Sequence, residues 1–75
     1  AEYAQAVPQF KKAILLDNRN ANYHYQLSLA YLAMRNYALA NKEAQLAQFK
    51  GHDIAPIKEK LLSVDAWKPT KKHGA

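Results

Sequence analysis

The side chains that could bind a metal or act as nucleophiles are few and widely spaced. The three histidines are His24, His52 and His73, and none is spaced from another histidine or a carboxylate as a zinc site on one helix requires. Cysteine is absent, so thiolate ligands, thiol nucleophiles and disulfides are excluded. The sequence therefore predicts no metal site.

Hydroxyl and phosphate chemistry has equally little support. Ser28 and Ser63 are the serines of the chain, and neither lies in a strand-turn-helix elbow of the kind that exposes a catalytic serine. Gly51 and Gly74 are isolated, so they cannot form a loop that cradles a phosphate.

The acidic residues complete the set of candidates for catalysis. His52 and Asp53 are adjacent in an expected loop, which is typical of helix punctuation, and Glu43 and Glu59 are expected to be separate, solvated charges on helix surfaces. We therefore predict a protein that is not an enzyme and that uses no cofactor and no small-molecule substrate.

The chain also contains an internal repeat with a fixed spacing. Four positions recur thirty-four residues later with one degenerate match: Tyr3, Ala6, Phe10 and Ala13 return as Tyr37, Ala40, Ala44 and Ala47. A period of that length indicates stacked helical hairpins. The segment between the copies has its own helical periodicity, which makes the first copy the second half of a hairpin, and we expect the chain to begin inside a repeat.

Apolar spacing predicts an all-α fold of four helices, at residues 3–16, 21–34, 37–49 and 55–66, and no strand pattern competes. The short turn at Arg35 and Asn36 makes the second and third helices an antiparallel pair. The packing face of the second helix is expected to be His24, Leu27, Ser28 and Tyr31. In the fourth helix the expected apolar face is Ile57, Leu61, Leu62 and Val64.

Several residues indicate where the helices begin and end. Asn18 or Asn20 is suited to cap the second helix, and Asp53 the fourth, by accepting bonds from free amides. Gly51 follows the third helix, where a left-handed residue is expected. Pro8 lies inside the first helix, so we expect fraying or a mild kink before Phe10.

Charge and size set broader limits. The chain has 75 residues and a net charge of +5, of which Lys68, Lys71 and Lys72 carry three in a short tail. The tail, 68–75, is expected to be disordered and solvated; the alternative is a basic surface for nucleic acid or an anionic membrane. The longest apolar run, 13–16, is far too short to span a bilayer. The sequence does not decide the compartment.

One complete copy and one partial copy of a known pattern are present. The complete copy is His24-x2-Leu27-Ser28-x2-Tyr31, then Ala40-x3-Ala44 and Ala47, and the partial copy is Ala6-x3-Phe10-x2-Ala13, then Leu16-Asp17-Asn18. The segment 3–64 resembles the tetratricopeptide repeat family, whose pattern is W-x2-L-G-x2-Y, then A-x3-F, then a proline. The chain departs from it at His24, Ser28, Ala44 and His52. A generic array of helical hairpins is the alternative fold.

The resemblance implies a right-handed solenoid fragment: residues 1–18 from a truncated repeat, a complete repeat at 19–52, a capping helix at 53–67 and the tail. It also implies a non-catalytic module that binds a protein or peptide on its concave surface. The matching positions are Asn22, Tyr25, Gln26, Leu29 and Ala33. Tyr25 and Leu29 favour an apolar or aromatic contact over a carboxylate clamp; alternatively, these two side chains pack on a neighbouring helix.

The first helix lacks a partner on one side in this interpretation. The side chains expected to be partly bare are Tyr3, Val7, Phe10 and Ile14. An upstream repeat, a second copy of the chain or a helix from another protein would cover them. We expect the isolated chain to self-associate through this face, so that its mass measured by light scattering rises with concentration; a mass that stays monomeric would contradict this.

Overall fold

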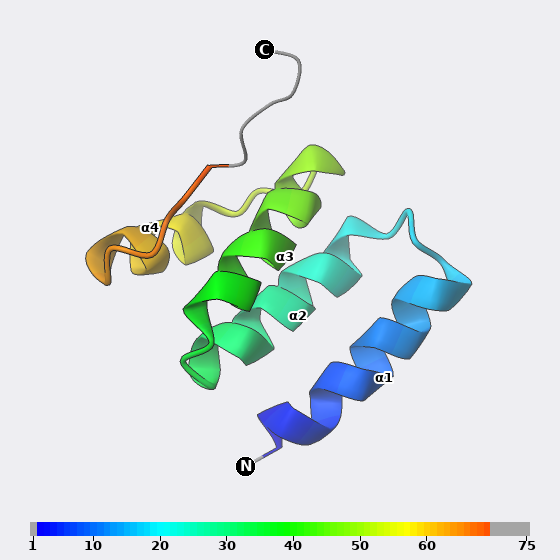
Figure 1. Ribbon diagram of the computed structural model, residues 1–75. Coiled ribbons are helices and arrows are strands. Elements are labelled where there is room, and N and C mark those ends of the chain that lie inside the picture. Colours follow the sequence, from blue (N-terminus) through cyan, green and yellow to red (C-terminus); the bar gives the residue numbers. More distant parts are fainter. Residues whose placement is uncertain (1, 70–75) are drawn as a thin grey trace.

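The computed structural model describes residues 2–69 and contains four α-helices (Figure 1). They are α1 (Tyr3–Leu16), α2 (Ala21–Ala33), α3 (Tyr37–Phe49) and α4 (Ala55–Ser63). No strand occurs among the described residues. The prediction of an all-α chain with four helices is therefore confirmed, and the bounds of α1 and α3 agree with the predicted ones.

The helices follow one another in space as they do in sequence. α1, α2 and α3 lie side by side with alternating directions, and α4 packs on α3, on the side away from α1 (Figure 1). α2 is therefore contacted on one side by α1 and on the other by α3. None of the helices in the described part of the chain is long and apolar enough to cross a membrane.

The starts of the helices follow the expected chemistry. Asn20 caps α2, since its side chain accepts a hydrogen bond of 3.0 Å from the Asn22 amide. Before α4, Asp53 Oδ1 accepts a bond of 3.0 Å from the Ala55 amide. The expected fraying at Pro8 is absent, because α1 is assigned without a break from Tyr3 through Pro8.

The ends of α2 and α4 correct the predicted bounds. α2 ends at Ala33, one residue early, and α4 ends at Ser63, three residues early. In both cases a residue with a side chain adopts the left-handed conformation that normally selects glycine: Arg35 has φ 62° and Asp65 has φ 57°. Gly51, with φ 101°, ends α3 as predicted.

Each of these three helices closes with the same pair of backbone hydrogen bonds. In α4 the Asp65 amide bonds to the Leu62 carbonyl at 3.0 Å and the Ala66 amide to the Leu61 carbonyl at 2.7 Å. This is the Schellman arrangement, which satisfies carbonyls that the helix end would leave unpaired. The turn at Asp65 ends α4, and residues 66–69 continue outside any helix or strand.

Close contact between α2 and α3 forms the centre of the core. The core cluster of buried apolar side chains comes from α2, α3 and the α4 region: Leu27, Tyr31, Ala40, Ala44, Ala47, Ile54, Ile57 and Leu61. The three alanines are completely inaccessible to solvent. Because their side chains are small, the two helix backbones can approach closely. Ser28 is also fully buried, and its Oγ donates a hydrogen bond of 2.6 Å to the Ala40 carbonyl, so the small polar side chain is satisfied.

α1 is packed less completely. No residue of α1 is fully buried, although Val7, Phe10 and Ile14 lie against the core cluster. The first copy of the repeated pattern therefore differs from the second in burial, because α3 packs against both α2 and α4 whereas α1 packs mainly against α2.

Residues 66–69, which we call the strap, return across α3. The Asn41 side chain donates to the Lys68 carbonyl at 2.9 Å and accepts from the Lys68 amide at 3.0 Å. Trp67 packs against the core cluster, and the Lys58 ammonium lies 5.1 Å from the centroid of its ring. Lys68, assigned to the tail from sequence, is thus bound through its main chain.

Candidate functional site

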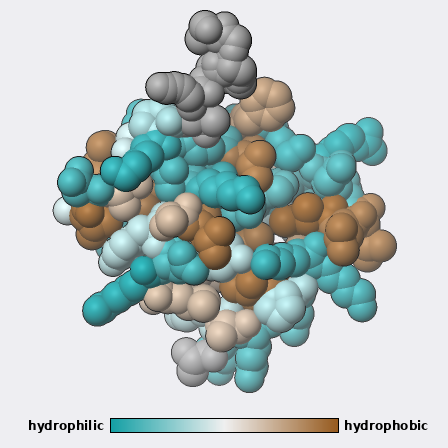
Figure 2. Space-filling view, viewed as in Figure 1, coloured by the Kyte–Doolittle hydropathy of each residue, from teal (hydrophilic) through white to brown (hydrophobic). Residues whose placement is uncertain are grey.

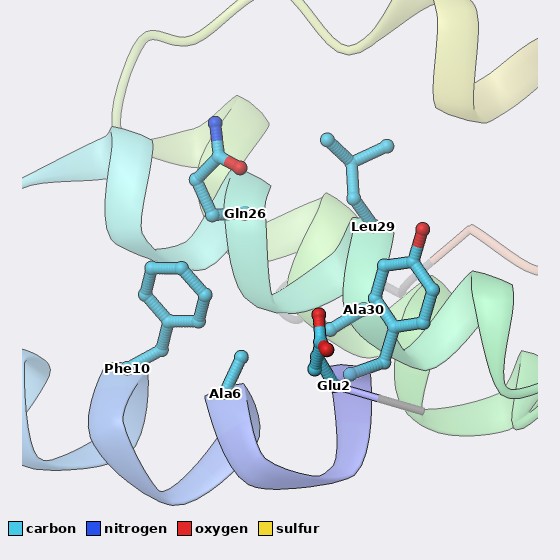
Figure 3. Close-up of a pocket in the computed structure, with 7 residues that line it drawn as sticks. Glu2, Ala6, Phe10, Gln26, Leu29 and Ala30 are labelled. Carbon is cyan, nitrogen blue, oxygen red and sulfur yellow. The ribbon is translucent and has the colours of Figure 1, made fainter.

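Two open hollows lie along α2 and share Tyr3 and Leu29 as walls. The smaller has a volume of about 380 Å³ and is lined by Glu2, Tyr3, Ala6, Phe10, Gln26, Leu29 and Ala30. Ala6 and Phe10 rise from α1 towards α2, and Gln26 and Leu29 project from α2 on the same side (Figure 3). This hollow is therefore the seam between the first two helices.

The larger hollow, which we call the groove, has a volume of about 730 Å³. Its lining comes from α1, α2, the turn after α2, α3 and α4: Tyr3, Leu29, Leu32, Ala33, Arg35, Tyr37, Lys60, Ser63 and Val64. Aliphatic side chains and two tyrosine rings make most of this lining. The charged groups in it are two cations, Arg35 and Lys60, and none is acidic. Such a surface suits an apolar side chain that has a carboxylate nearby.

The five residues predicted to contact a partner separate into three environments. Leu29 and Ala33 line the groove, and Leu29 and Gln26 line the smaller hollow. Asn22 is exposed in the first turn of α2, where its Oδ1 accepts from Gln26 at 3.5 Å. Tyr25 lines neither hollow. The structure thus brings three of the five to hollow surfaces.

The Tyr25 side chain instead packs against the loop between α3 and α4. Its ring stacks on His52 with centroids 4.1 Å apart and an angle of 16° between the planes. His52 Nδ1 lies 2.9 Å from the Asp53 carbonyl oxygen. A carbonyl can only accept a hydrogen bond, so this contact requires the tautomer with a proton on Nδ1. The alternative raised from the sequence is that Tyr25 packs on a neighbouring helix, whereas its ring contact is with His52 in the loop after α3.

A pair of polar side chains joins α2 to α3 away from the hollows. His24 Nδ1 lies 2.7 Å from Glu43 Oε1, and both side chains are nearly buried. The expectation that Glu43 is a solvated surface charge is therefore wrong: it projects towards α2 and bonds to His24. Sequence analysis missed this pair because the residues are distant in sequence, although His24 had been placed on the packing face. Neither side chain lines a hollow, so we assign the pair a structural role.

The four residues expected to mediate self-association are placed unequally. Val7, Phe10 and Ile14 are half-buried against the core, whereas Tyr3 is 51% exposed. The most exposed apolar side chains of α1 are Leu15 and Leu16, at its last turn. Figure 2 shows apolar surface at that end of α1, on the right of the view. Self-association stays a prediction, with Tyr3 as the more accessible member of the predicted set.

Within residues 2–69 no cluster of three or more histidine or acidic side chains is placed to hold a metal ion. The basic tail considered from sequence falls largely outside the described residues, since Lys71, Lys72 and His73 are not among them.

Comparison of the chain with known proteins gives no match to a family model, to a curated protein or to a solved structure.

Proposed function

We propose that this chain is a tetratricopeptide-like interaction module that binds a peptide segment of a protein partner in the groove. The main support for this proposal is the groove. It has a volume of about 730 Å³, is lined mostly by aliphatic and tyrosine side chains, and has Leu29 and Ala33 among its lining residues. Those two positions match the concave, partner-binding face that the resemblance implies.

The packing of the hairpin supports the proposed repeat architecture. Positions where the family has small residues are the solvent-inaccessible Ala40 and Ala47, and Ser28 stands at the glycine position with no exposed surface. Leu27 and Tyr31, at the leucine and tyrosine positions, belong to the core cluster. Burial of the degenerate motif on one hairpin is what a stacked repeat requires.

The charges at the groove define the class of peptide. Arg35 and Lys60 lie on different elements, and the lining contains no carboxylate that would neutralise them. A partner that combines an aliphatic or aromatic residue with an acidic one satisfies both the apolar walls and these cations. The charge contribution acts mainly on specificity and association rate, so binding is expected to weaken as salt increases.

Substitution of Leu29, which lines both the groove and the smaller hollow, tests the proposal. Peptides selected from a random display library on the native chain are expected to lose binding to the Leu29→Ala chain by about tenfold or more, because Leu29 lines both hollows. Affinity is measured by fluorescence anisotropy. Alanine is the best helix former, so the helical circular dichroism signal is expected to be retained.

Leu39→Ala is the matched control, since Leu39 is an exposed leucine of α3 that lines neither hollow. Selected peptides should bind this variant as they bind the native chain. Failure to select any peptide, or equal loss of binding in the two variants, would contradict the groove as the partner site.

A further inference from the structure

The strap is held on α3 by contacts to main-chain atoms of a single residue. Asn41 donates to the Lys68 carbonyl and accepts from the Lys68 amide, at 2.9 and 3.0 Å. Gln45, one turn further along α3, donates to the same carbonyl at 3.0 Å and to Asn41 Oδ1 at 3.3 Å. A side-chain amide that bonds to both the N–H and the C=O of one residue acts as a neighbouring β-strand would. Such contacts recognise extended chain whatever side chain the gripped residue has.

Contacts to the preceding residue add side-chain selectivity. Trp67 is half-buried against the core cluster, and Lys58 of α4 places its ammonium 5.1 Å from the ring centroid. A cation over an aromatic face favours an aromatic residue, tryptophan most of all. The residue that follows, Pro69, disfavours helical geometry at Lys68. An extended geometry at Lys68 is compatible with the bonds that Asn41 makes to both its N–H and its C=O.

We propose that Asn41, Gln45 and Lys58 form a peptide-docking site on the α3–α4 surface, separate from the groove, and that the strap is its resident ligand. The site takes an extended segment in which an aromatic residue directly precedes the residue held through its main chain. Its occupant in the free chain is the chain's own residues 66–69, because the tether keeps them at an effective concentration in the millimolar range.

The strap is able to leave the site without loss of the helical core. Its three hydrogen bonds to α3 lie at exposed positions, and it is connected to α4 by Asp65, which has a left-handed backbone conformation with φ 57°. A free peptide of the same chemistry is therefore expected to occupy the site when the strap is weakened.

Trp67 is the sole tryptophan, so its fluorescence reports the strap in the full chain. Quenching of this fluorescence by acrylamide is expected to be restricted in the native chain and to rise at least twofold in Asn41→Ala, with the helical circular dichroism signal unchanged. Gln48→Ala is the matched control, an exposed amide of α3 with no contact to the strap among the described interactions. A native Trp67 quenched as freely as in the unfolded chain, or unaffected by Asn41→Ala, would overturn the proposal.

A second measurement tests the site in trans. A synthetic peptide copying residues 64–69 is added at millimolar concentration to the full chain carrying Trp67→Ala, and the side-chain amide signals of Asn41 and Gln45 are followed by NMR. These signals are expected to shift with the peptide and not with a copy in which its tryptophan is alanine; the native chain, whose site is filled, is expected to shift less. Equal shifts with both peptides, or none with either, would overturn the proposal. Should Trp67→Ala fail to fold, the quenching comparison in the Asn41→Ala chain decides the question.

Discussion

Leu61→Ala is expected to lower the free energy of unfolding by about 2–5 kcal/mol, the usual cost of removing a fully buried leucine. Leu61 of α4 is completely inaccessible to solvent and belongs to the core cluster together with Ile54 and Ile57. These three side chains anchor α4 and the residue before it. A domain of this size has little stability to lose, so the variant is expected to be largely unfolded or to detach α4. Urea titration followed by circular dichroism measures the change.

Leu62→Ala is the matched control, because the neighbouring leucine of the same helix is 56% exposed. Its effect is expected to stay within about 0.5 kcal/mol, as for most surface substitutions. Since α4 supplies Lys60 and Ser63 to the groove, and its C-cap supplies Val64, Leu61→Ala should abolish peptide binding while Leu62→Ala preserves it. Equal destabilisation by the two variants would show that α4 does not pack through the face described here.

The sequence predicted the four helices because they obey local rules. The apolar spacing of α1 and α3 gave both pairs of bounds, and Asn20 and Gly51 are residues that favour a cap and a left-handed stop. The ends of α2 and α4 were less predictable, because Arg35 and Asp65 are not the residues that a left-handed stop normally selects.

The candidate site was predictable only where helical periodicity determines it. Leu29 and Ala33 lie on one stripe of α2, and the structure places both in the groove. The other wall of the groove depends on how α4 crosses α3, which no local pattern encodes. The stacking of Tyr25 on His52 and the grip of Asn41 on Lys68 likewise join segments that are distant in sequence. Polar and aromatic residues of these types also occur at solvent-exposed positions, so their identity in the sequence does not reveal these two contacts.

Ala44→Phe is expected to destabilise the chain by about 1–3 kcal/mol, or to prevent native packing, because the substitution inserts a ring where no space is open. Ala44 has no accessible surface and lies one turn from Ala40, whose carbonyl accepts the Ser28 hydroxyl, so this face of α3 is in close contact with α2. The family pattern has an aromatic residue at this position. At this position the chain has a buried alanine in place of the aromatic residue of the pattern that it resembles. Thermal unfolding measures the loss.

Ala38→Phe provides the matched comparison, since Ala38 is an exposed alanine in the first turn of the same helix. Both variants carry the same small loss of helix propensity, so the difference between their unfolding free energies isolates the packing of Ala44. The Ala38 variant is expected to remain folded and to unfold near the native temperature. Equal stability of Ala44→Phe and Ala38→Phe would contradict this prediction. It would mean that α2 and α3 have room for an aromatic side chain at position 44, and that the buried alanines do not set the spacing of this hairpin.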